Sequence, residues 1–213
     1  MRCTVGQGLL LVLAAYSHAA DGPELGLVLN FDSAPSPVFL QTMKAELGSI
    51  LAPAHLKLNW VTLDKTRGLE GQPRVMILRF HGNCAAAKSN VQTQVDEPQN
   101  ITLASTAFSG DLILPDSESN CDKVRNFVES KPAGQPGSET RLGLAMARVM
   151  AHEVYHFLLQ TRHHGKKGIS RARMTPSALV GPVISFDRVE LEKISGQNRN
   201  APEAIAPAHS FLP

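Results

Sequence analysis

The 213-residue sequence contains no phosphate-binding loop, no dinucleotide-binding glycine motif and no Gly-x-Ser-x-Gly motif. Charge of neither sign dominates, because the formal net charge is only +2. Nothing therefore favours a nucleic acid or a membrane surface as partner. Beyond the first twenty residues, no apolar run approaches the roughly 20 residues that a transmembrane helix needs. We expect neither a nucleic-acid partner nor a membrane anchor.

The composition that remains is that of a folded globular protein. Hydrophobic residues make up 43% and charged residues 19%, which excludes a disordered chain and a coiled coil. A chain of this length suits one domain, with or without a tail. The sequence does not determine the oligomeric state, and we take a monomer as the default expectation.

The first nineteen residues have the pattern of a secretory signal peptide. Arg2 precedes an apolar run from Leu9 to Ala15, and Ser17 and Ala19 are small residues suited to a cleavage site. We expect cleavage after Ala19 and a protein that is secreted or periplasmic. A buried N-terminal helix is the alternative explanation of this run.

Export determines how the cysteines are interpreted. Two of the three, Cys84 and Cys121, lie after the signal peptide. In an oxidising compartment two such cysteines most often pair. Their disulfide would close a loop of about 38 residues, which stabilises by about 4 kcal/mol in the chain-entropy model. Two free thiols or a metal pair are the alternatives.

Hydrophobic periodicity predicts a single α/β (α+β) domain over residues 20–194. Strands are expected at 26–31, 56–63 and 74–80, with one or two more within 101–114. Helices are expected at 38–51, from 140 to about 158, and at 186–194; the middle one is the most apolar. An irregular basic loop is expected over 162–177. From Ser195 to Pro213 no periodicity remains, which predicts a loose tail.

The most apolar predicted helix contains His152-Glu153-x-x-His156. Residues four apart lie on one helix face, so the two imidazoles can bind one Zn²⁺ at about 2.0–2.1 Å each. Glu153 lies about 100° around the helix from His152, where it can take a proton from a water on the metal. The motif therefore predicts one zinc ion, two ligands and a general base.

A catalytic zinc usually has a third protein ligand. His163 and His164 follow shortly. A straight helix would place His163 about 10 Å beyond His156, so the chain must turn after about Gln160, and Gly165 can provide a reversing residue. We prefer His164 because it adjoins Gly165, and keep His163 as the alternative. A carboxylate of the last helix, Glu190 or Glu192, is a third possibility.

The motif, followed shortly by another histidine, resembles the metzincin clan of zinc metallopeptidases, whose pattern is H-E-x-x-H-x-x-G-x-x-H. The resemblance covers about residues 141–174. It implies a zincin-like fold with a twisted mixed sheet, an N-terminal helix, a central active-site helix and an irregular C-terminal part. It also implies that His152, His156 and His164 bind zinc, that Glu153 is the catalytic base, and that Met174 forms the methionine turn beneath the metal.

Two features depart from that pattern. Leu159 occupies the place of the clan's glycine, and His164 lies eight residues after His156 instead of six, so the turn must be longer. Tyr155, inside the motif, is the only tyrosine after the signal peptide. Members of the clan with a tyrosine near the metal are therefore not a complete guide.

Two further features bear on substrate binding. Five basic residues surround the predicted zinc loop and are either solvated or favour acidic side chains in the substrate: Arg162, Lys166, Lys167, Arg171 and Arg173. The strands within 101–114 could include an edge strand along which an extended peptide pairs.

Three functions are compatible with these observations. The first is a secreted zinc endopeptidase that acts on a peptide or protein. The second is a zinc-bearing binding module without catalysis on the same fold. The third is a metal-free exported protein in which the motif is accidental.

Overall fold

The computed structural model describes residues 24–63, 74–85, 101–129 and 137–199. The predicted signal peptide, residues 1–19, and residues 200–213 of the predicted tail lie outside this part of the chain. The strands are β1 (Glu24–Phe31), β2 (Lys57–Thr62), β3 (Val75–His81), β4 (Ala104–Ser109) and β5 (Leu112–Asn120). The helices are α1 (Pro37–Leu51), the short 3-10 helix η1 (Ala52–Ala54), α2 (Cys121–Val128), α3 (Ser138–Leu159), α4 (Pro176–Val180) and α5 (Arg188–Arg199).

The five strands form one mixed sheet in the order β2-β1-β3-β5-β4. β1 is parallel to both β2 and β3, and β3 is parallel to β5. Of the five, only β4 runs antiparallel to its neighbour, β5, and the strand order places β4 at one edge of the sheet and β2 at the other. The predicted mixed α/β class is therefore confirmed, and the predicted edge strand is β4.

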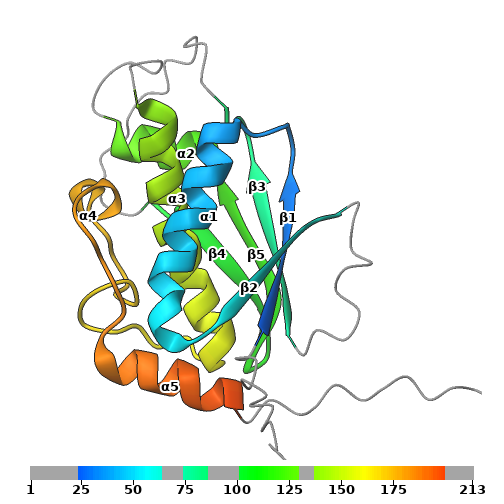
Figure 1. Cartoon of the computed structure of the whole chain (residues 1–213), viewed down its shortest axis with the longest axis vertical. Coiled ribbons are helices and arrows are strands. Elements are labelled where there is room, and N and C mark those ends of the chain that lie inside the picture. Colours follow the sequence, from blue (N-terminus) through cyan, green and yellow to red (C-terminus); the bar gives the residue numbers. More distant parts are fainter. Residues whose placement is uncertain (1–23, 64–73, 86–100, 130–136, 200–213) are drawn as a thin grey trace, which may run out of the picture.

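One face of the sheet is packed and the other is partly open. In β3 the alternate residues Met76, Leu78 and Phe80 are buried, whereas Arg79 points to the opposite face and pairs with Asp116 at 2.8 Å. Helices α1 and α3 lie side by side against the packed face (Figure 1). This arrangement makes the central helix part of the core.

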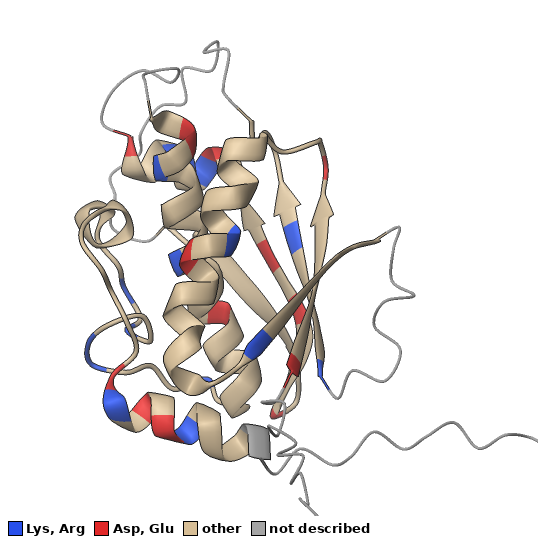
Figure 2. Ribbon diagram, in the orientation of Figure 1, with Lys and Arg blue, Asp and Glu red and all other residues tan. Residues whose placement is uncertain are grey.

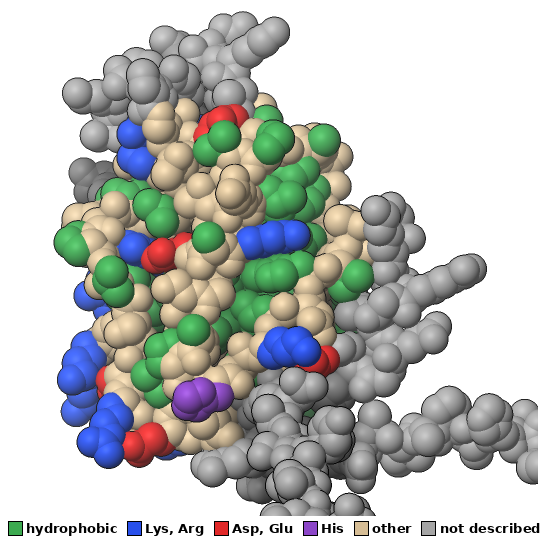
Figure 3. Space-filling model, in the orientation of Figure 1, with side chains coloured by type: hydrophobic (Ala, Val, Ile, Leu, Met, Phe, Trp, Pro, Cys, Tyr) green, Lys and Arg blue, Asp and Glu red, His purple; other side chains and the backbone are tan. Residues whose placement is uncertain are grey.

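Helix α1 has the apolar face that the sequence predicts. Ser36 caps its start by accepting a hydrogen bond from the backbone N–H of Phe39 at 3.1 Å, and Pro37 occupies the first turn. Its buried residues recur at helical spacing: Phe39, Met43, Leu47, Ile50 and Leu51. On the face of the molecule seen in Figure 3, hydrophobic side chains remain visible between this helix and the sheet.

Gly143 of α3 allows the close approach of α1. A Cβ atom at Gly143 would lie 2.8 Å from Cβ of Thr42 and 2.9 Å from the carbonyl oxygen of Phe39. We expect Gly143→Ala to lower the free energy of unfolding by about 1–3 kcal/mol, because the helices must separate. Urea unfolding checks this.

Gly48 of α1 provides the matched control for that substitution. A Cβ atom there meets nothing within 4 Å. Gly48→Ala should therefore stabilise the protein by about 0.5–1 kcal/mol through helix propensity alone. A Gly143→Ala protein as stable as the Gly48→Ala protein would contradict the close packing of α1 on α3.

Arg148 of α3 is buried and joins three elements. Its Nε donates to Oε1 of Glu46 in α1 at 2.8 Å, and its Nη1 donates to the carbonyls of Ala178 and Gly181 at 2.9 and 3.1 Å. The buried guanidinium is thus paired and hydrogen-bonded, as burial of a charge requires. It fixes α4 against the middle of α3.

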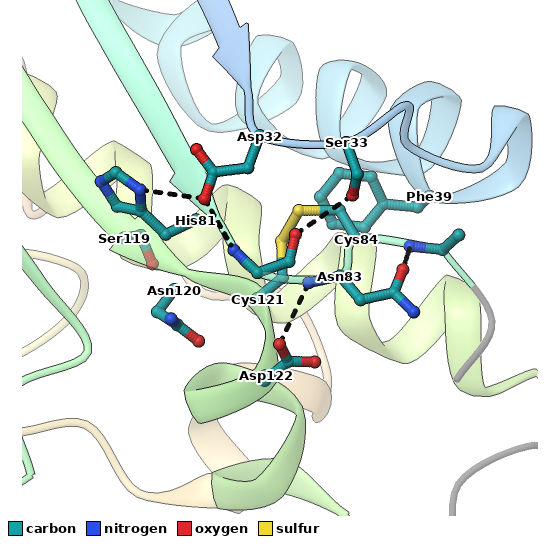
Figure 4. Close-up of a disulfide and its surroundings, with 12 residues drawn as sticks. Asp32, Ser33, Phe39, His81, Asn83, Cys84, Ser119, Asn120, Cys121 and Asp122 are labelled. Atoms are coloured by element: carbon teal, nitrogen blue, oxygen red, sulfur yellow. Dashed lines mark hydrogen bonds and ion pairs between the residues drawn. A yellow bond between two sulfur atoms is a disulfide. The ribbon is translucent and has the colours of Figure 1, made fainter. Parts of the chain in front are cut away.

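Cys84 and Cys121 form the predicted disulfide, with a Cα–Cα distance of 5.2 Å. Cys84 follows β3 and Cys121 begins α2, so the bond joins the carboxyl ends of β3 and β5. Figure 4 shows it among polar side chains, with Asp32 contacting His81 and Asp122 accepting from the backbone N–H of Asn83.

The predicted elements agree with the observed ones in kind but not always in extent. Helix α2 was not predicted, although Asn120 caps it and its apolar residues Cys121, Val124 and Val128 recur at helical spacing. Its eight residues are fewer than the about 11 over which periodicity indicates a helix. The predicted final helix, 186–194, is α5, which begins two residues later and extends to Arg199. The first five residues of the predicted tail are therefore helical. No helix in the described ranges is long and apolar enough to cross a membrane.

Candidate metal centre

Helix α3 carries His152 and His156, and both side chains are buried. Every residue from Ala145 to His156 is buried, as expected of a helix with apolar residues on all sides. The two histidine side chains lie one turn apart on the same face. Their Nε2 atoms are 3.0 Å apart.

Backbone carbonyls orient both rings. Nδ1 of His152 lies 2.8 Å from the carbonyl oxygen of Ile169, and Nδ1 of His156 lies 2.6 Å from that of Thr161. A carbonyl oxygen only accepts, so each Nδ1 carries the proton and each Nε2 has a free lone pair. Burial lowers the pKa of both histidines, which favours the neutral rings that metal binding requires.

His164 completes a group of three imidazoles. Its ring stacks on that of His152 with centroids 5.1 Å apart, and it meets the ring of His156 edge-on at 4.8 Å. One ligand atom from each of the three lies within 4.8 Å of the others. Within the described ranges, no other three or more His, Cys, Asp or Glu side chains form such a group.

The other proposed third ligands lie elsewhere. His163 lines a surface depression between α3 and α5, together with Tyr155 and Lys193. Glu190 is buried in contacts with Ser170 and Asp187. Glu192 is exposed and pairs with Arg188.

The chain turns toward His164 at Gln160, where the sequence predicted a turn. Gly165 was expected to be able to reverse the chain. The residue with left-handed conformation at this turn is instead Gln160, with φ of 47°, and Gly165 does not have a positive φ. The side chain of Gln160 offsets the strain through tertiary hydrogen bonds. Its Oε1 accepts from the N–H of Ile113, and its Nε2 donates to the carbonyls of Ile113 and Phe157.

Glu153 is buried beside the histidines and is held by the edge strand. Its Oε2 accepts a hydrogen bond from the hydroxyl of Thr106 in β4 at 2.6 Å. The hydroxyls of Thr106 and Ser117 are also 2.6 Å apart. Because Thr106 donates its one proton to the carboxylate, Ser117 must donate to Thr106. Two hydroxyls thus form a directed chain that ends on Glu153.

Opposing effects act on the carboxyl group of Glu153. Burial raises its pKa, whereas the hydrogen bond from Thr106 and the charge of His156 lower it. A carboxylate with a raised pKa takes up a proton more readily, as a general base must. Sequence reasoning did not identify Thr106 or Ser117, which lie 47 and 36 positions before Glu153 and reach it only through the order of the strands.

The remaining predicted residues lie in the segment between α3 and α4. Met174 is half-buried and packs against the hydrophobic core just before Thr175, which caps α4. Arg162 stacks on Phe108 of the edge strand, 3.8 Å from the ring centroid, and donates to the carbonyl of Gly110. Lys166, Lys167 and Arg173 are exposed, and Arg171 is partly buried. Figure 2 shows basic residues along this loop at the left edge of the molecule.

The residues present fit a zinc ion. Two nitrogens bound at about 2.0–2.1 Å in a tetrahedral site lie about 3.3 Å apart, close to the observed separation of the two Nε2 atoms. Two neutral imidazoles whose lone pairs face each other at this distance repel unless a cation lies between them. The donor set of three imidazoles with a neighbouring carboxylate is typical of catalytic zinc.

Comparison with known proteins adds little to this geometry. No family model matches the sequence, and no curated protein is significantly similar to it. Among solved structures, the fold matches archaemetzincin from Methanopyrus kandleri with a TM-score of 0.45 and 12% sequence identity. The match covers 85% of this chain and 98% of the other. The functional argument therefore rests on the residues of this chain.

Proposed function

We propose that this protein is an exported zinc-dependent endopeptidase. The observation that carries the proposal is the convergence of three imidazoles beside a buried, oriented carboxylate. His152, His156 and His164 would hold the metal, and Glu153 would be the general base.

Zinc bound by three protein ligands lowers the pKa of a bound water and polarises a substrate carbonyl. Glu153 takes a proton from the attacking water and passes it to the leaving nitrogen. Thr106 occupies Oε2 of Glu153, so the proton is carried on Oε1. The carbonyls of Ile169 and Thr161 keep the two ligand rings in the binding tautomer.

A zinc-bearing module without catalysis is the alternative. The three histidines alone would serve it equally well. A binding module, however, has no use for a buried carboxylate held beside the metal by two hydroxyls. That network favours the enzyme.

Cleavage of a diverse peptide library by the protein comprising residues 20–213 tests the activity. The proposal predicts cleavage that a chelator abolishes and added zinc restores. Zinc binding without cleavage of any library member would favour the binding module.

Thr106→Val tests the orientation of the base. Valine keeps the shape of threonine and removes the hydroxyl. We expect kcat to fall about 10–100-fold, the equivalent of one hydrogen bond to a charged group, with KM and zinc affinity unchanged. Thr106→Ser keeps the hydroxyl and should retain activity, and equal losses in both variants would contradict this role.

Strand β4 is suited to bind the substrate backbone. It is one of the two edge strands of the sheet, the other being β2, and its Thr106 contacts the base, so a peptide added to this edge passes the metal centre. We expect N-methylation of a cleaved peptide to reduce kcat/KM about 2–10-fold at every second position, because alternate residues pair with an edge strand. Tolerance at all positions would count against strand addition.

Export is part of the proposal. The disulfide between Cys84 and Cys121 supports it, because such bonds persist in oxidising compartments. N-terminal sequencing of the protein recovered from a secreting host tests it: a start at Ala20 is expected, and a retained Met1 would contradict it.

A further inference from the structure

The loop between His164 and Ser170 supports two of the three metal ligands. His164 begins it, and the carbonyl of Ile169 near its other end accepts the hydrogen bond from His152. Gly165 and Ser170 are joined across the loop, because the N–H of Gly165 donates to the carbonyl of Ser170 at 2.9 Å. The position of this loop therefore affects both histidines.

A buried hydroxyl fixes the loop to helix α5. The side chain of Ser170 is inaccessible to solvent, and its hydroxyl donates to Oε1 of Glu190. The carbonyl of Lys167 lies farther away, at 3.3 Å, and the hydroxyl has one proton, so the charged and nearer acceptor takes it. A Cβ atom on Gly165 would collide with Ser170 and Glu190, so only glycine fits beside this contact.

The two carboxylate oxygens of Glu190 make different contacts. Its Oε2 accepts from the N–H of Asp187 at 3.0 Å, and Oδ1 of Asp187 accepts from the N–H of Glu190 at 2.9 Å. This reciprocal pair is a capping box that starts α5. Its Oε1 is the oxygen that holds Ser170. One carboxylate thus connects the start of the last helix to the metal loop.

Helix α5 is itself anchored to the rest of the domain. Ser195 donates to the carbonyl of Ala54 at 3.2 Å, and Nη2 of Arg74, just before β3, donates to the carbonyl of Gln197 at 3.1 Å. In Figure 1 the helix lies across one end of the molecule, beneath the ends of α1 and α3. These contacts hold α5 in place, so the loop between His164 and Ser170 can be positioned by binding to it.

We propose that Glu190 is a positioning residue that, through Ser170, holds the loop presenting His164 and the Ile169 carbonyl to the metal. The inference rests on the proposed function only in assuming that the three histidines bind zinc. It assigns the C-terminal helix a part in forming the metal centre.

The chain offers controls that separate this role from general stability. Glu192 lies on the same helix but is exposed and pairs only with Arg188 among its described contacts, so Glu192→Ala removes a charge without touching the loop. Asp187→Ala removes one half of the capping box and leaves the contact between Glu190 and Ser170. Ser170→Ala removes the loop contact and leaves the capping box.

Zinc affinity, measured by competition with a chromogenic chelator, is the first readout. We expect Ser170→Ala and Glu190→Ala to weaken zinc binding about 10–100-fold, the usual effect of losing a group that orients a metal ligand. Glu192→Ala should be unchanged within twofold, and Asp187→Ala should lower the melting temperature alone. Equal zinc affinity in all four variants would overturn the proposal, as would a loss in Asp187→Ala that matches the loss in Glu190→Ala.

Limited proteolysis of the metal-free protein is the second readout. Trypsin cleaves after Lys166 and Lys167, which are exposed within the loop. We expect at least about tenfold faster cleavage there in Ser170→Ala and Glu190→Ala than in Glu192→Ala, because local opening exposes the backbone. Unchanged cleavage would overturn the positioning role. A wild-type protein that binds no zinc would refute the proposed function and leave this readout valid.

Discussion

Glu153→Gln is expected to lower kcat/KM for peptide cleavage by about 10²–10⁴-fold while zinc remains bound. Glutamine has the size of glutamate and can still accept the hydrogen bond from Thr106 through its amide oxygen. It cannot take the proton of the attacking water. Steady-state kinetics together with the zinc content of the variant measure the two effects separately.

The control for this substitution is a measurement of the variant's stability. Glu153 is buried, so its replacement could destabilise the protein. Unfolding by urea establishes whether stability is retained, and the comparison of activities is made where both proteins are fully folded. A folded, zinc-bound Glu153→Gln protein with full activity would contradict the role of Glu153 as base.

His164→Ala is expected to weaken zinc binding by more than about 100-fold, beyond the usual effect of losing a residue that only orients a ligand. His164 lies against both His152 and His156, whereas its neighbour His163 lines a separate depression. His163→Ala should therefore bind zinc as the wild type does. Chelator competition on both variants makes the comparison.

The adjacent histidines make this a sharp test. Both substitutions remove the same side chain from neighbouring positions of one exposed segment. A loss of zinc in His163→Ala, with His164→Ala unaffected, would reverse the assignment. Equal affinity in both would direct the search for a third ligand to other residues.

Local pattern was sufficient to predict the parts of the site that lie within one helix. The spacing of His152 and His156 determines their common face, and apolar residues around them predict a buried helix. The strands of the packed sheet were equally recognisable, because alternation in β2 and apolar runs in β1 and β3 are local features. These signals need no knowledge of the rest of the fold.

The rest of the site depends on contacts between distant segments. Thr106 reaches Glu153 because β4 is the edge strand beside α3, and nothing in the sequence around Thr106 indicates this. The position of the turn at Gln160 was predicted, but its cause was not. The backbone strain of Gln160 is offset by side-chain hydrogen bonds to Ile113, which lies 47 residues earlier. Glu190 was considered as a ligand because carboxylates bind zinc, but its oxygens are occupied by Ser170 and Asp187.

Elemental mass spectrometry of the untagged protein comprising residues 20–213 tests the central claim most directly. The proposed site predicts about one zinc per chain, lost in His152→Ala, because three imidazole ligands fill three positions of one tetrahedral ion. Absence of zinc in the wild-type protein after incubation with it would contradict the metal centre, and the proposed peptidase activity with it.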